Sequence, residues 1–272
     1  MSEIPVEAQV APSKTKVDVA LNKALITAKV SDSALEKILP FSTDLELRER
    51  YINFFNGLRL GKLLEDLDLM AGQVAYRHTE GWERGMTIVT AACDRIDLLG
   101  ELLSDRDLQL LSSINWVGRS SMEVGVKISS KEDDSWKRVA RAYFIMVARR
   151  EGKAEAVNSL EVVSMDEQRR FREGEQRQHE RRSISQTSYL NNTPTAEESQ
   201  VLHELFLQIK KGEVEGVSME NSIRQSTLLM HPQSRNVHDN IFGGYLMREA
   251  FELAWNITYL YCRQKPKFIS MD

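Results

Sequence analysis

A long amphipathic stretch constrains what the first half of the chain can fold into. Between residues 45 and 74, apolar side chains recur at spacings of three and four, the period of a helix with one buried face. An isolated helix of this kind is only marginally stable in water, so its stripe must be buried against other parts of the protein. The stripe consists of Leu60, Leu63, Leu64, Leu67, Met70, Ala71 and Val74.

Runs of strand-forming residues follow this stretch and can supply the missing surface. One of them alternates apolar and polar positions, with Met122, Val124, Val126 and Ile128 on the same side. Four consecutive strands after one long helix predict an α+β fold with an antiparallel sheet, and a further short strand is expected before the helix. The expected strands cover residues 34–41, 86–99, 108–117, 121–129 and 138–149.

A charged segment separates the first half from the second. Residues 165–182 are almost all charged or glutamine, with arginine and glutamate interleaved. This mixture predicts a solvated linker helix rather than an arm that binds nucleic acid. A second helix is expected at residues 195–211, because Thr195 and Glu198 have the spacing of a capping box.

The order of elements in the first half then begins again. We expect a strand at 222–230, a loop at 232–239, a helix that starts at Gly243-Gly244, and the beginning of a strand at 267–271. When the two helices are laid over each other, Gly61 falls on Gly244. The sequence therefore predicts one complete unit and a partial second unit. The expected divisions are a disordered N-terminal segment at 1–32, a first domain at 33–155, a charged helical linker at 156–218 and a partial second domain at 219–272.

Charge and composition argue against several classes of function. The formal net charge of -4 gives no electrostatic case for binding nucleic acid. The two cysteines lie far apart, and none of the five histidines belongs to an HExxH or Cys/His cluster, so no metal site is expected. No apolar run reaches about 18 residues, so no insertion into a membrane is expected.

Motifs in both halves carry a resemblance to a known family. The entry to the second helix resembles that of hotdog acyl-CoA thioesterases, and motifs of the first half look like the double-hotdog type found in mitochondria. The resemblance covers about residues 33 to 272. The motifs of the second half are His231-Pro232-Gln233, Asn236 and Asn240-Ile241-Phe242-Gly243-Gly244-Tyr245-Leu246-Met247; those of the first are Arg59-Leu60-Gly61, Leu64-Glu65-Asp66-Leu67-Asp68, Asn115-Trp116-Val117-Gly118 and Ser121-Met122-Glu123-Val124.

This resemblance implies a hotdog fold, in which a curved antiparallel sheet wraps a long central helix. It implies hydrolysis of acyl-CoA to a free fatty acid and CoA without a metal or other cofactor, and a homo-oligomer formed by pairing of hotdog units. It also implies a mitochondrial location, although the N-terminus has no arginine before Arg48 and does not look like a presequence. A cytoplasmic location is the alternative. Chains of the family continue with more strands, so we expect this one to be truncated within the second unit.

The resemblance also implies a site shared between the two units. It assigns the catalytic carboxylate to Asp68, seven positions after Gly61, and the catalytic amide to Asn240. The oxyanion and substrate contacts fall on Gly243, Gly244 and Asn236. The counterpart of Asp68 in the second unit is Phe251, and the counterpart of Asn240 in the first unit is Gly57, so the two units look divided in their roles.

Other interpretations of these residues remain open. Asp68 could be a surface carboxylate or a buried, hydrogen-bonded one, with Asp66 as a rival, and Asn240 could simply cap its helix. A hotdog hydratase is a second enzymatic reading, for which His238 next to Asp239 is the only hint. A third is a truncated, non-catalytic hotdog protein that binds acyl-CoA or pairs with a full-length partner.

Overall fold

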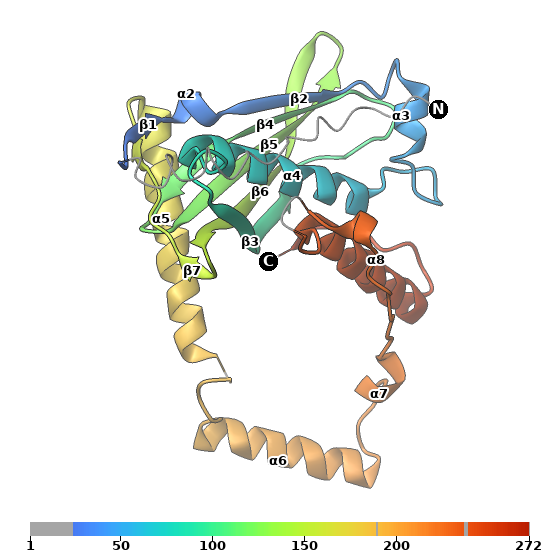
Figure 1. Ribbon diagram of the computed structural model, residues 1–272. Helices are drawn as coiled ribbons and strands as arrows, with labels where there is room; N and C mark the ends of the chain where they lie inside the picture. The colour runs from blue at the N-terminus through green and yellow to red at the C-terminus, as the bar shows by residue number, and fades with distance from the viewer. Residues whose placement is uncertain (1–23, 189, 237–238, 272) are drawn as a thin grey trace.

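A helix held in a curved antiparallel sheet forms the centre of the molecule. The computed structural model describes residues 24–188, 190–236 and 239–271. Helix α4 (Leu60–Thr79) crosses the inner face of a sheet with strand order β2-β4-β5-β6-β3-β9, and each neighbouring pair is antiparallel (Figure 1). The strands are β2 (Leu35–Leu39), β3 (Thr87–Leu98), β4 (Leu108–Val117), β5 (Ser121–Glu132), β6 (Ser135–Arg150) and β9 (Ser270–Met271); β7 (Lys153–Ala154) pairs with β6.

The core lies between α4 and the inner face of the sheet. The apolar side of β5 is buried, as its alternation predicts, and Phe144 of β6 is fully buried beside it. The predicted helical stripe faces this surface. Its buried members are Leu63, Leu64, Leu67, Met70, Ala71 and Val74. The predicted α+β fold with an antiparallel sheet is therefore confirmed.

The helical region at 45–74 is interrupted, so the prediction of one continuous stretch is wrong. Helix α3 (Leu45–Glu49) ends early, and α4 starts only at Leu60. Between them Asn56 has a φ of 58°, a left-handed conformation that a helix cannot contain. The Asn53 side chain accepts the N–H groups of Phe55 and Gly57, which stabilises this turn against the helix.

Part of the N-terminal segment is ordered, so disorder throughout 1–32 is the wrong prediction. Strand β1 (Thr27–Lys29) pairs in parallel with β8 (Ser159–Glu161), and helix α2 (Val30–Ser33) follows it. The buried Asn158 explains this order. Its side chain accepts the N–H of Ile26 and donates to the carbonyl of His78 at the end of α4. Residues 1–23 lie outside the described part of the chain.

Helix α5 (Met165–Thr187) packs on the outer face of the sheet instead of standing free as a solvated linker. Arg177 forms two hydrogen bonds, of 2.6 and 3.0 Å, with the fully buried carboxylate of Glu123. Gly174 is buried, and a Cβ there would lie 2.7 Å from Cβ of Trp116. The charged composition of α5 is the same whether the helix is solvated or packed, because arginines make many of its contacts with the sheet.

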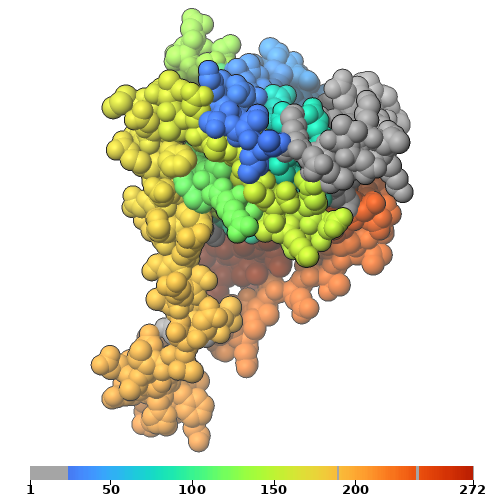
Figure 2. All heavy atoms as spheres, turned by 60° about the vertical axis from the view of Figure 1, so that its left-hand side comes forward, coloured from blue at the N-terminus to red at the C-terminus, as the bar shows by residue number. Residues whose placement is uncertain are grey.

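The chain then leaves the body and returns. Helix α6 (Ala196–Lys211) projects away from the sheet (Figure 2), and its predicted capping box between Thr195 and Glu198 is present. Helix α7 (Met219–Ser222) follows, and residues 223–230 are exposed and form no strand. The strand expected at 222–230 is therefore wrong: an apolar run becomes a strand only where a neighbour pairs with it.

Helix α8 (Gly243–Cys262) begins at the predicted glycine pair and lies beside α4 (Figure 1). Contacts from Arg59 to Glu252 and from Glu65 to Arg248 show that the two helices run antiparallel. Beyond α8, β9 pairs with the edge of β3, a shorter strand than the one expected at 267–271. Within the described residues no helix is both long and apolar enough to cross a membrane.

Two glycines inside helices should respond oppositely to alanine. Nothing lies within 4 Å of a Cβ on Gly72 in α4, so Gly72→Ala should stabilise the fold by about 0.5–1 kcal/mol. At Gly174 the contact with Trp116 requires α5 to shift, so Gly174→Ala should destabilise it by roughly 1–3 kcal/mol. Urea unfolding midpoints measure both changes. A Gly174→Ala protein as stable as Gly72→Ala would contradict the packing of α5.

Candidate active site

Asp68 lies between α4 and α8 and not on the surface. Its side chain on α4 is buried, with the residue only 2% exposed. The hydroxyl of Thr90 donates to Oδ1 over 2.7 Å, and the backbone N–H of Gly244 also donates to the carboxylate. Asp68 is the predicted catalytic residue of the first unit. In the structure it contacts the glycine pair that was predicted as the substrate-binding part of the second unit.

The environment of Asp68 makes its carboxylate a stronger base than usual. Burial is the largest influence on the pKa of Asp68 and raises it, because the charged form loses its hydration. The hydrogen bonds from Thr90 and Gly244 lower the pKa and offset part of this effect. Such a carboxylate can accept a proton from water at less cost than an exposed aspartate can.

The start of α8 supplies hydrogen-bond donors at the same place. Its N-cap residue, Phe242, makes no side-chain cap, so the N–H groups of the first turn have no partner of that kind. A Cβ on Gly243 would lie 3.2 Å from Oδ2 of Asp68, so the absence of a side chain leaves this approach open. The positive end of the helix therefore faces the buried carboxylate.

The neighbouring acids of α4 are engaged elsewhere. Asp66 accepts hydrogen bonds from Lys37 over 2.9 Å and from the hydroxyl of Tyr51, which ties α4 to β2 and to the loop before α4. Glu65 pairs with Lys62 at 2.5 Å and with Arg248 at 2.9 Å. Asp66 is therefore a structural carboxylate, and Asp68 is the acid that faces the helix N-terminus.

The two asparagines lie in the loop that leads into α8. Asn240 is exposed, and its backbone N–H donates to Oδ1 of Asn236 over 3.2 Å, while the N–H of Asn236 donates to the carbonyl of Asn240. These bonds close the loop in front of Gly243. Among the described residues, no hydrogen bond links the Asn240 side chain to Asp68, so the structure places this amide near the helix entry without joining it to the carboxylate.

Thr90 is a site residue that the sequence did not indicate. It lies in β3 and pairs with Met146 of β6, and a bulge follows directly between Thr90 and Ala92. Because Met146 is buried in the core, Thr90 points to the inner face, where it meets Asp68. A polar residue at an inward position of a strand is a signal that could have identified it, since such a side chain needs a partner.

A hollow on the other face of the sheet does not belong to this site. It lies between α5 and the strands β3 and β6, and its walls include Arg95, Arg141 and Arg177. Arg95 and Arg141 both bond to Asp97 at 2.8 Å, and Arg177 bonds to Glu123, so each of the three guanidinium groups already has a carboxylate partner. In the described part of the chain, no group of three or more His, Cys, Asp or Glu side chains could hold a metal ion.

The sequence of the chain is similar to that of known enzymes. Acyl-coenzyme A thioesterase 9, mitochondrial, from Homo sapiens is 37% identical over 260 residues, which are 90% of this chain and 59% of that protein. Its counterpart from Mus musculus is also 37% identical, over 92% of this chain and 61% of its own length. The chain is similar to mitochondrial acyl-CoA thioesterases. It spans about three-fifths of the length of these relatives, and no family model matches it.

Solved structures agree on the fold. The acyl-CoA hydrolase from Bacillus cereus superposes with a TM-score of 0.51 at 25% identity, covering 62% of this chain and 99% of that one. A hexameric acyl-CoA thioesterase gives a TM-score of 0.50 at 24% identity, with 60% and 100% covered. The predicted hotdog fold is confirmed by this likeness together with the helix and antiparallel sheet of the structure.

Ionisation of Asp68 should weaken the fold relative to a neutral isostere. Because burial raises the pKa of Asp68, the folded protein keeps this proton to a higher pH than the unfolded chain, whose pKa is about 3.9. The wild type should therefore lose free energy of unfolding relative to Asp68→Asn as the pH rises from about 4 through the raised pKa. Urea unfolding of both proteins across this range measures the loss. A stability difference that does not change with pH would contradict the raised pKa.

Proposed function

We propose that this chain hydrolyses acyl-CoA thioesters, releasing a free fatty acid and CoA. The observation that carries the proposal is the contact between the buried Asp68 carboxylate and the first turn of α8, to which the two units of the fold each contribute one side. Thioester hydrolysis needs an activated water and donors for a developing oxyanion, and these are the two components that meet here. The relatives' activity supports the same conclusion.

The reaction follows from these groups. Asp68 takes a proton from a water molecule whose oxygen attacks the thioester carbonyl carbon, and the carbonyl oxygen becomes an oxyanion. N–H groups of the first turn of α8, beyond the one given to Asp68, stabilise that oxyanion. When the tetrahedral intermediate collapses, the C–S bond breaks and the CoA sulfur receives the proton held by Asp68. Thr90 keeps the carboxylate oriented during both transfers.

The amide of Asn240 has the role of orienting the attacking water or holding the carbonyl. Support comes from its position three residues before Gly243 and from the hydrogen bonds with Asn236 that close the loop. Asn236 is a substrate-binding residue in this proposal. The loop between them includes residues 237 and 238, which lie outside the described residues. The structure therefore does not describe His238, the histidine of the predicted hydratase pair.

The wider assignments follow from the same proposal. The first hotdog domain covers residues 33–155, the helical linker covers 156–218, and residues 219–272 belong to the second hotdog unit. Pairing of hotdog units forms a homo-oligomer, which the hexameric thioesterase of the same fold supports. The mitochondrial names of the relatives support a mitochondrial location.

The hydratase alternative is not favoured by the geometry. Its only hint was an Asp/His pair at residues 238–239, and the Asp239 side chain is 92% exposed, where its nearest ionic partner is Arg235 at 3.8 Å. A carboxylate so exposed lies outside any buried site. An acyl-CoA binder without activity stays as the alternative that the activity assay decides.

Asp68→Asn should reduce CoA release by at least about 100-fold, because the amide cannot accept the proton from water. Acyl-CoAs of short and long chain are tested with a thiol reagent that detects free CoA. Asp66→Asn is the matched control on the same helix: it removes an acceptor of Tyr51 and Lys37, so it should lower the melting temperature while turnover stays within about threefold. Full activity of Asp68→Asn would refute the proposal, and binding of acyl-CoA without release by the wild type would favour the non-catalytic alternative.

The two asparagines can be separated in the same assay. Asn240→Ala should lower kcat by about tenfold or more if its amide acts on the water or carbonyl. Asn236→Ala should mainly raise KM, because its side chain orders the loop that receives the substrate. The reverse pattern, a loss of kcat in Asn236→Ala alone, would move the catalytic amide to residue 236.

A further inference from the structure

The contacts of α8 with α4 and its N-cap form a ladder of three levels, spaced four residues apart along α8. At the first level the N–H of Gly244 donates to Asp68. At the second, Arg248 pairs with Glu65 at 2.9 Å. Glu65 precedes Asp68 by three residues and Arg248 follows Gly244 by four, so each helix moves by about one turn, in opposite directions.

The third level lies four residues further along α8 and reaches the N-cap of α4, six residues before Glu65. Arg59 forms hydrogen bonds of 2.9 and 3.2 Å to the two carboxylate oxygens of Glu252, which is one turn beyond Arg248. A bidentate pair of this kind constrains direction as well as distance. The active-site contact is therefore the end of a series of charged contacts that fixes how far α8 can slide along α4.

Glycines allow the helices to come this close. A Cβ on Gly244 would lie 2.9 Å from Cα of Glu65, and one on Gly61 would lie 3.0 Å from Cγ of Arg248 and from Oε1 of Glu252. Both glycines face residues of the ladder. The two helix backbones therefore come closest at the same places where the charged side chains pair. The close approach alone does not fix the axial position of a helix, whereas a charge pair does.

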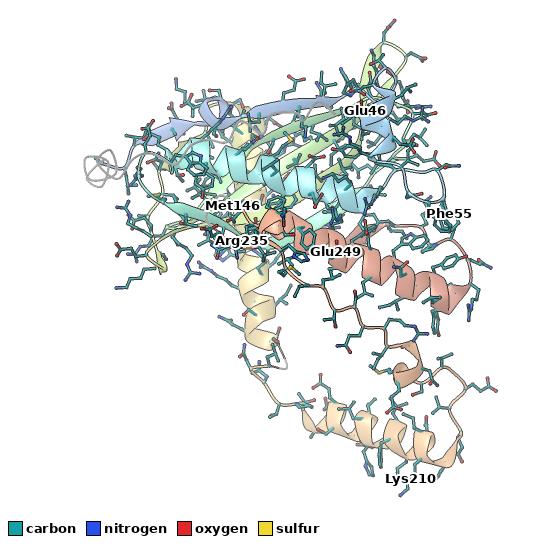
Figure 3. The ribbon with its side chains drawn as sticks, turned by 45° about the vertical axis from the view of Figure 1, so that its right-hand side comes forward. Glu46, Phe55, Met146, Lys210, Arg235 and Glu249 are labelled. Carbon is teal, nitrogen blue, oxygen red and sulfur yellow. The ribbon has the colours of Figure 1, made fainter. Side chains whose placement is uncertain are left out.

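The middle level is better shielded than an ordinary surface ion pair. The side chains of Glu65 and Arg248 are 11% and 19% exposed, and the guanidinium group of Arg248 also lies 4.9 Å from the ring centroid of Tyr245. Reduced hydration strengthens the attraction between such charges. By contrast, Glu249 lies on α8 itself (Figure 3), so its bond with Arg248 joins neighbours within one helix and cannot hold the two helices together.

We propose that Arg248, acting through Glu65, is a positioning residue that holds the first turn of α8 in register with Asp68. This inference rests on the proposed thioesterase activity and adds residues outside the reacting groups to it. A displacement of about 1 Å between catalytic groups can cost on the order of 100-fold in rate. Loss of the Arg248 contact removes the level next to the site, while the Arg59 level, two turns away, still holds the helices together.

The kinetic test compares Arg248→Met, Glu65→Gln and the double variant in the full chain. Arg248→Met should lower kcat for CoA release about tenfold with KM changed by less than about twofold. The double variant should be no slower than the slower single variant, because both remove one interaction. Arg248→Lys, which keeps the charge, should recover activity to within about threefold of the wild type. Glu249→Gln, the matched control, removes the other partner of Arg248 and should leave kcat unchanged.

A second readout does not depend on turnover. Amide hydrogen exchange at Gly244, followed by NMR, reports the bond to Asp68 directly, since a first-turn N–H has no partner within its helix. Exchange should become at least about fivefold faster in Arg248→Met and stay at the wild-type rate in Glu249→Gln and Arg248→Lys. If Arg248→Met does not fold, Glu65→Gln serves in its place, because it leaves Arg248 paired with Glu249.

The two proposals fail in different ways. Unchanged exchange at Gly244 in Arg248→Met, or kinetic losses that add in the double variant, would overturn the positioning role. Faster exchange in Arg248→Met, together with a wild type that releases no CoA, would overturn the thioesterase activity while the ladder stands. Equal losses in Arg248→Met and Glu249→Gln would show that the pair within α8 matters and the contact with Glu65 does not.

Discussion

Burial of α4 is the interaction on which the rest of the structure depends. The sheet covers the apolar stripe of this helix, and α8 lies along another side, so polar residues of α4 are carried into the interior as well. A buried carboxylate is costly unless it has partners. Each acid of α4 solves this differently: Asp66 takes cationic and phenolic donors, Glu65 takes two cations, and Asp68 takes a hydroxyl and a backbone N–H. The three neighbouring acids are thus held by three different kinds of partner.

Much of the architecture could be predicted because it follows from local pattern. The stripe of α4, the alternation in β5 and the capping box of α6 are each encoded within a few turns or residues, and each appears in the structure where it was expected. Asp68 and the Gly243-Gly244 pair were predicted from the family resemblance, and the structure brings them into contact. Helical periodicity alone would have left Asp68 on the flank of the stripe with no partner.

The errors arose where distant parts of the chain decide the outcome. The run at 222–230 has the composition of a strand but no neighbour to pair with, and the polar segment around Thr27 becomes a strand because β8 and Asn158 lie beside it. Helix α5 looked solvated because its contacts with the sheet are ionic. Thr90 was missed because its role depends on the register of β3 against β6 and on where α4 crosses them.

Helices α5, α6 and α7 join the two units in one chain, and this affects how the sequences of the two units can change independently. In a homodimer of identical units, every substitution occurs twice, so a residue that suits one side of the interface must be tolerated on the other. In one continuous chain the two copies of the helix are separate stretches of sequence. The position held by Asp68 in α4 corresponds to Phe251 in α8, which packs against Phe268. Joining the units thus lets the same position serve as a carboxylate in one copy and as a packing residue in the other.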